Sequence, residues 1–103
     1  MYKLNYFVPL QYKEQTKQAL FSIGAGSYNN YEACCFESIG ISQFKPLHNA
    51  HPYIGEHNKI ESIQEYKIEM ICKAKLIRKA IEVLKQSHPY EEVAYEVIKL
   101  ENF

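Results

Sequence analysis

Residues 66–84, YKIEMICKAKLIRKAIEVL, carry a strand pattern followed directly by a helix pattern. In the first part apolar and charged residues alternate, which predicts a strand with one buried face from about Ile63 to Cys72. In the second part apolar residues recur at three- and four-residue spacing. They form the stripe of an amphipathic helix: Leu76, Ile77, Ala80, Ile81 and Leu84. This helix must end before Pro89, because proline disfavours helical geometry in the residue that precedes it.

Further elements are predicted on either side of this stretch. Alternation from Tyr2 to Val8 predicts a strand closed by Pro9, and the spacing of apolar positions predicts a helix over Gln11–Ile23 that ends at Gly24 and Gly26. Strands are also expected over Ala33–Ile39 and Val93–Leu100. The order strand, helix, strand, strand, helix, strand predicts an α+β, ferredoxin-like fold: a four-stranded antiparallel sheet with two helices on one face.

Composition limits the classes of function. The 103 residues are 47 % hydrophobic, enough for one core, so residues 1–103 are expected to form a single domain. Twelve basic and twelve acidic residues give a net charge of zero, which argues against nucleic-acid binding and against a polybasic membrane anchor. No apolar run approaches the roughly 20 residues of a membrane span. Three cysteines, an odd number, and an amino-terminal stretch unlike a signal peptide predict a cytoplasmic protein.

One face of the predicted sheet is left without helices. Apolar strand residues nevertheless point toward it, namely Phe7, Phe36 and Ile71. A homo-oligomer would cover such a face, so we expect several copies of the chain to associate.

The connection from Gly40 to about Ser62 is long for a small domain, and connections of this length are uncommon unless they are functional, interfacial or disordered. It contains His48, His51 and His57, together with Glu56. Imidazoles and a carboxylate could bind Zn(II) or Cu(II), although their spacing matches no strong zinc motif. The alternative is a polar, solvated loop.

The tripeptide His-Pro-Tyr occurs at 51–53 and again at 88–90, where Glu91 and Glu92 follow it. His88 could be an ordinary helix-end residue and Tyr90 a packing anchor. Alternatively, His88 could form an acid–base or ligand-binding pair with Glu91 or Glu92, as in a hydrolase-type enzyme that uses His88 and Glu91. No nucleophile motif or phosphate-binding loop accompanies them, and Cys34, Cys35 and Cys72 lack the spacing of a redox pair.

Several segments taken together resemble a known family. They are Val8-Pro9, Gly24-Ala25-Gly26, Tyr31-Glu32-Ala33-Cys34, Gln43-Phe44-Lys45-Pro46, Pro52-Tyr53-Ile54-Gly55, Glu65, Lys67-Ile68-Glu69 and His88-Pro89-Tyr90-Glu91-Glu92. In this order they resemble the PII/CutA-like domain inserted in YqfO-type members of the NIF-three-like family, a domain that also occurs as short stand-alone proteins. The chain departs from the family pattern at Ser42, Asn49 and Asn58, where glycine is expected, and at His51, where asparagine is expected.

The resemblance implies a ferredoxin-like module that forms small oligomers and binds ligands in clefts between subunits. The family's dimetal centre lies in a surrounding domain, so no hydrolase activity is carried over. The matching polar positions are Glu65, Glu69, His88, Tyr90 and Glu91, which we predict to bind a small molecule or a protein partner. The leading hypothesis is therefore a binding module without catalysis of its own, and the alternative is a metal-binding protein that uses His48, His51 and His57.

Overall fold

Four strands and two helices build the protein, whose computed structural model describes residues 1–103. Their order is β1 (Tyr2–Val8), α1 (Leu10–Ser22), β2 (Phe36–Phe44), β3 (Glu61–Cys72), the short 3-10 helix η1 (Ala74–Leu76), α2 (Ile77–Ser87) and β4 (Tyr95–Lys99). The strands form one antiparallel sheet in the order β2-β3-β1-β4. This topology confirms the predicted ferredoxin-like fold.

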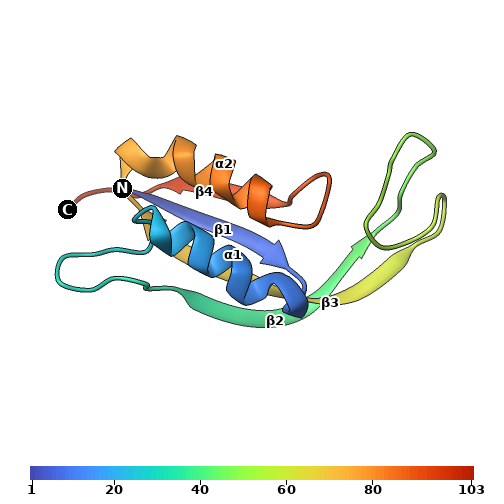
Figure 1. The fold of residues 1–103 in the computed structure, drawn as a ribbon, viewed down its shortest axis with the longest axis horizontal. Coiled ribbons are helices and arrows are strands. Elements are labelled where there is room, and N and C mark those ends of the chain that lie inside the picture. The colour runs from blue at the N-terminus through green and yellow to red at the C-terminus, as the bar shows by residue number, and fades with distance from the viewer.

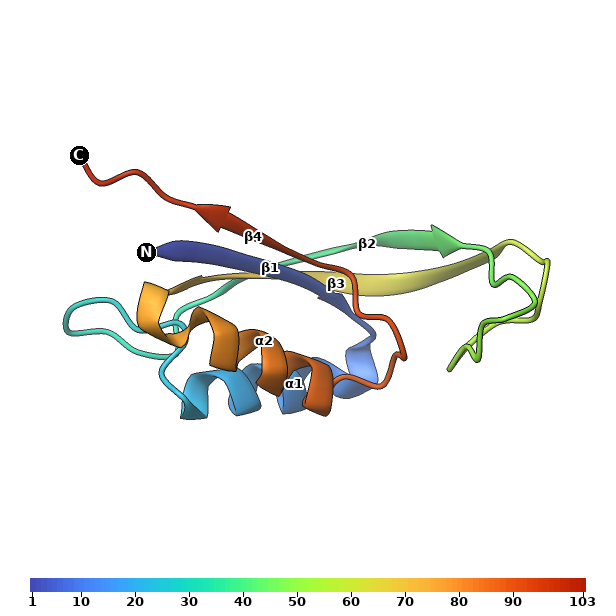
Figure 2. The same ribbon diagram turned by 90° about the horizontal axis from the view of Figure 1, so that it is seen from above.

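The core lies between the sheet and the two helices, which cover the same face (Figure 2). Pairing of β1 with β3 sets Leu4 opposite Met70 and Tyr6 opposite Ile68, so the alternating apolar residues of both strands share this face. The helices contribute the fully buried residues Leu20, Ala80 and Leu84. The apolar stripes read from the sequence are therefore the buried faces. Neither helix has the length and apolar character needed to cross a membrane.

Glycines shape the turn after α1. Gly24 has φ +101°, and the next amide, that of Ala25, donates to the Leu20 carbonyl at 3.2 Å, which closes the helix end. Gly26 has φ +77° and donates to the Ile71 carbonyl at 2.8 Å, which fastens the turn to β3. A Cβ atom at Gly26 would lie 2.8 Å from the Cys34 carbonyl oxygen, so this position requires glycine for two reasons.

The predicted second strand is displaced along the chain. The sequence predicts it over Ala33–Ile39, but Ala33 has φ +57° and the Cys34 amide donates to the Gly26 carbonyl at 2.8 Å. With these contacts the stretch before Phe36 is irregular backbone outside the strand. The strand continues instead through Gly40 to Phe44, which pairs with Glu61 of β3. The predicted long connection therefore shrinks to residues 45–60. The last strand begins at Tyr95 rather than Val93.

The β2–β3 hairpin extends beyond the helices and carries loop 45–60 at its tip (Figure 1). At the opposite end the two termini lie near each other, where the Leu100 amide donates to the Met1 carbonyl at 3.1 Å. On the helix-free face Phe36 is 65 % exposed. Phe7 and Ile71 share this face by register and are half-buried, as the sequence predicts.

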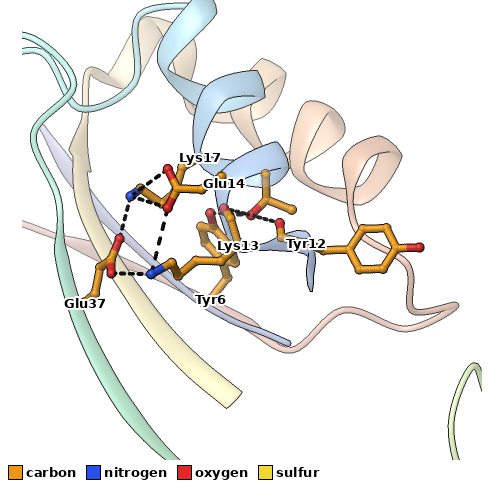
Figure 3. A network of polar contacts seen from close by, with 7 residues as sticks. Tyr6, Tyr12, Lys13, Glu14, Lys17 and Glu37 are labelled. Carbon is orange, nitrogen blue, oxygen red and sulfur yellow. Dashed lines mark hydrogen bonds and ion pairs between the residues drawn. The ribbon is translucent and has the colours of Figure 1, made fainter. Parts of the chain in front are cut away.

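An ionic network fastens the edge strand β2 to α1 (Figure 3). The Glu37 carboxylate accepts hydrogen bonds from Lys17 and, at 2.9 Å, from Lys13. These bonds lower the pKa of Glu37, and the bond to Glu37 raises the pKa of Lys13. Nearby, the buried Tyr6 hydroxyl donates to Oγ1 of Thr16 at 2.9 Å, so the polar end of this core residue is satisfied.

Candidate functional site

A cleft of about 730 Å³ separates loop 45–60 from the segment between α2 and β4. It is also lined by Phe7 at the end of β1 and by the distal part of the β2–β3 hairpin. Eight of its 17 lining residues are hydrophobic. Its volume falls within the range of about 300–1,000 Å³ that is usual for small-molecule sites. Figure 1 shows the two segments that face each other across it, loop 45–60 and the connection that follows α2.

Glu65 and Tyr90 form a hydrogen-bonded pair in the wall of the cleft. Glu65 is only 5 % exposed, and its Oε2 accepts a 2.6 Å hydrogen bond from the Tyr90 hydroxyl. Burial and then the adjacent carboxylate raise the pKa of Tyr90, so the phenol keeps the proton that it donates. Gly40 lies opposite Glu65 in the sheet and places no side chain beside it. The pair thus presents a carboxylate and a phenol from a rigid strand and a proline-stiffened segment.

His88 holds this segment against β1. It ends α2, is 6 % exposed, and its Nε2 lies 2.7 Å from the Phe7 carbonyl oxygen. Its Nδ1 accepts a hydrogen bond from the Tyr90 amide at 3.2 Å. These two partners require a neutral ring with the proton on Nε2, and burial lowers the pKa of His88 accordingly. His88 does not line the cleft; it orients Tyr90, whose ring centre lies 4.7 Å from its own.

Loop 45–60 is attached to the body at two points. The Tyr53 ring packs between Tyr12 of α1 and Tyr90, with ring centres 5.9 and 6.1 Å apart. The His51 amide donates to Oε2 of Glu91 at 2.7 Å. Tyr12 and Tyr53 were not among the predicted site residues. For Tyr53 the signal in the sequence was that His-Pro-Tyr occurs twice, because Tyr53 of the first tripeptide packs against Tyr90 of the second.

The predicted ligand-binding residues fall into three places. Glu65, Tyr90 and Glu91 line the cleft together, whereas His88 lies behind them. Glu69 lies on the helix-free face of the sheet, outside the cleft, where it pairs with Lys3 at 2.7 Å. The hydrogen bond from Lys3 lowers the pKa of Glu69.

The histidines of loop 45–60 do not converge on one point. The Nε2 atom of His57 lies 2.7 Å from the Ala50 carbonyl oxygen, and His51 contributes its backbone amide rather than its ring. His48 has no part in these contacts. No group of three or more His, Cys, Asp or Glu side chains is arranged to hold a metal ion. The histidines of loop 45–60 are therefore not brought together into a metal-ligand group.

Comparison of the sequence with known proteins identifies relatives that are much longer than this chain. No family model matches it. The chain is 41 % identical over 99 residues to a GTP cyclohydrolase 1 type 2 homolog of Bacillus subtilis, covering 96 % of this chain and 26 % of the relative. It is 40 % identical over 102 residues to a GTP cyclohydrolase 1 type 2 homolog of Halalkalibacterium halodurans, covering 99 % and 27 %. The chain thus spans about a quarter of the length of these relatives.

Solved structures show the same relationship. A Bacillus cereus protein related to NIF3 superposes with a TM-score of 0.83 at 40 % identity, over 98 % of this chain and 26 % of that one. CutA1 from Pyrococcus horikoshii superposes with a TM-score of 0.72 over 100 % of this chain and 86 % of that one. At 18 % identity the second match shows the fold alone. The chain therefore has a CutA/PII-like fold and is the counterpart of one segment of the NIF3-related GTP cyclohydrolase 1 type 2 homologs, as its motifs predict.

Proposed function

We propose that this chain is a cytoplasmic ligand-binding module whose cleft, between loop 45–60 and segment 88–94, holds a small molecule without catalysing its conversion. The observation that carries the proposal is the cleft of about 730 Å³ with the buried Glu65–Tyr90 pair in its wall. Apolar walls with a few fixed polar groups are the usual composition of a small-molecule site.

The state of His88 favours binding over catalysis. Both of its ring nitrogens are engaged, one with the Phe7 carbonyl and one with the Tyr90 amide. A general base needs a free nitrogen within hydrogen-bond reach of the substrate, and His88 lies outside the cleft lining. The chain corresponds to only 26 % of the Bacillus subtilis relative, so we do not assign the activity of that whole protein to this chain.

Association of several copies is the second part of the proposal. β2 is an edge strand that exposes Phe36, Ile39 and Ile41, the last of them to 71 %. Edge strands offer unpaired backbone groups, and exposed apolar residues along them favour pairing with another chain. We propose that a second copy of the chain covers β2. The alternative is a different protein partner, and the oligomeric state of the purified protein distinguishes the two.

Native mass spectrometry of untagged protein tests both parts in one spectrum. We expect an oligomer that carries a discrete small-molecule mass. In a Glu91→Ala variant loop 45–60 loses its anchor at His51. In a His88→Ala variant the Tyr90 backbone amide loses its hydrogen-bond acceptor, Nδ1 of His88. Both variants should release the bound mass, whereas Glu82→Ala on the exposed side of α2 should retain it. Retention by all three folded variants, or a bare monomer for the unmodified protein, contradicts the proposal.

A further inference from the structure

The charges that line the cleft are unbalanced. Glu65, Glu91 and Glu92 face a single basic residue, Lys45. None of the three carboxylates forms an ion pair within the chain, whose seven ion pairs all involve other acids: Glu14, Glu37, Glu56, Glu69 and Glu82. The cleft is therefore anionic. No cation of the chain is paired with its three carboxylates, so they are available to a positively charged ligand.

Glu65 makes this imbalance significant because it is 95 % buried. The Tyr90 hydroxyl occupies only one of its oxygens, Oε2, and no other side-chain or backbone donor bonds to Glu65. An opposite charge placed beside such a carboxylate compensates for the solvation that burial removes. The second oxygen is thus an unused acceptor, held on a strand that lines the cleft.

The positive charge that fits this cleft belongs to an extended molecule. A bare metal ion needs several ligands around one point, and no group of three His, Cys, Asp or Glu side chains is arranged in that way. Four aromatic residues line the same cleft, namely Phe7, Phe44, Tyr53 and Tyr90. Aromatic faces attract organic cations as well as apolar groups.

We propose that the ligand is an organic cation, an ammonium group joined to an apolar or aromatic body. Its ammonium would donate to Glu65, and its body would lie against Tyr53, Phe44 and the other aromatic walls. This inference rests on the proposed ligand-binding function and specifies the chemistry of that same site. A single lysine facing three carboxylates also disfavours phosphate-bearing ligands, because phosphate recognition relies on cations or on clustered backbone amides.

Three probes of similar size and different charge test the proposal: phenethylammonium, 2-phenylethanol and 3-phenylpropionate. Each is titrated into ¹⁵N-labelled protein, and amide shifts at residues 49–54 and 90–94 locate binding at the cleft. We expect phenethylammonium to bind at least about tenfold more tightly than 3-phenylpropionate, the factor expected for a hydrogen bond to a charged group. Added salt should weaken this preference.

Glu65→Gln supplies the decisive variant, because its amide oxygen can still accept from Tyr90 while the charge is lost. We expect about a tenfold loss of phenethylammonium affinity, against no change for 2-phenylethanol. Glu82→Gln, outside the cleft, is the matched control and should change neither affinity. Two results would overturn the ligand class but not the binding function of the cleft. One is that 3-phenylpropionate shifts the same amides and binds as tightly as phenethylammonium or more tightly. The other is that the native mass spectrum shows a bound anion. If no probe shifts the cleft amides and no small molecule is retained in the native spectrum, both the ligand class and the binding function are wrong.

Discussion

The hydroxyl of Tyr90 donates a 2.6 Å hydrogen bond to Oε2 of Glu65, a residue 25 positions earlier in the chain. This bond joins the segment that follows α2 to the middle of β3, beyond the end of β1. It fixes one wall of the cleft, and Tyr53 of loop 45–60 packs against the same tyrosine ring.

Tyr90→Phe removes this hydrogen bond and leaves the buried Glu65 carboxylate without its donor. We expect a loss of about 1.5–3 kcal/mol in the free energy of unfolding, the range for a hydrogen bond to a charged group, measured by urea denaturation. Tyr31→Phe is the control, because Tyr31 is 74 % exposed and its hydroxyl has no partner. Equal stability of the two variants would show that the Tyr90–Glu65 bond contributes nothing measurable.

The pH dependence of stability should report on His88. Burial lowers its folded-state pKa below the ordinary value of 6.5, so the unfolded chain takes up a proton more readily than the folded protein. The stability is fully present above pH 6.5 and falls as the pH drops from there toward the folded pKa. His88→Gln should flatten the curve between pH 7 and 5, whereas His48→Gln at an exposed position should leave the slope unchanged. An unaltered slope in His88→Gln would assign the effect to other groups.

Two glycines provide a contrast of backbone strain. Gly26→Ala places a Cβ at φ +77° and 2.8 Å from a carbonyl oxygen, so we expect a loss of at least about 1 kcal/mol in unfolding free energy. Gly40→Ala places its Cβ in open space, and its strand position favours the change. Thermal unfolding of both variants is the measurement. A similar decrease in melting temperature for both would refute the strain argument at Gly26.

The carboxylate of Glu37 should titrate below the usual range for glutamate, because hydrogen bonds from Lys17 and Lys13 favour its charged form. A ¹³C-detected NMR titration measures this pKa directly. Lys17→Met should raise it, since the hydrogen bond from Lys17 to Glu37 is lost. Lys79→Met, on α2 and outside the network, should leave it unchanged; a value insensitive to Lys17 would mean that the network does not persist in solution.

Association through β2 predicts a response to charge on that strand. Ile41→Lys puts a cation on the exposed edge, a change that opposes edge-to-edge pairing, and we expect it to shift the oligomer toward monomer in light-scattering measurements. Leu10→Lys makes the same type of change at a 60 % exposed position on α1 and should leave the mass unaltered. An oligomer that withstands Ile41→Lys would place the interface elsewhere.

The sequence by itself determined the order of the elements and the buried faces of β1, β3 and α2. Alternation in β1 and β3 and the stripe of α2 are local patterns that follow from burying one side of a strand or a helix, so they can be read without knowing the neighbours. The sequence also predicts that the His-Pro-Tyr-Glu-Glu segment follows a helix, because its proline sets where α2 must end. Where local patterns are weak, as between Ala33 and Phe44, the boundaries were wrong: backbone contacts between Gly26 and Cys34 decide where β2 begins.

The site itself was decided by tertiary structure. Glu65 and Glu69 have the same parity on β3, yet one lines the cleft and the other pairs with Lys3, because only Glu65 lies beyond the end of β1. Likewise, the meeting of His51 with Glu91 joins residues 40 positions apart. Such pairings depend on strand register and on the path of two connections, which are set by contacts between distant segments. The residue pattern within one connection therefore does not predict which residues of the other connection it will contact.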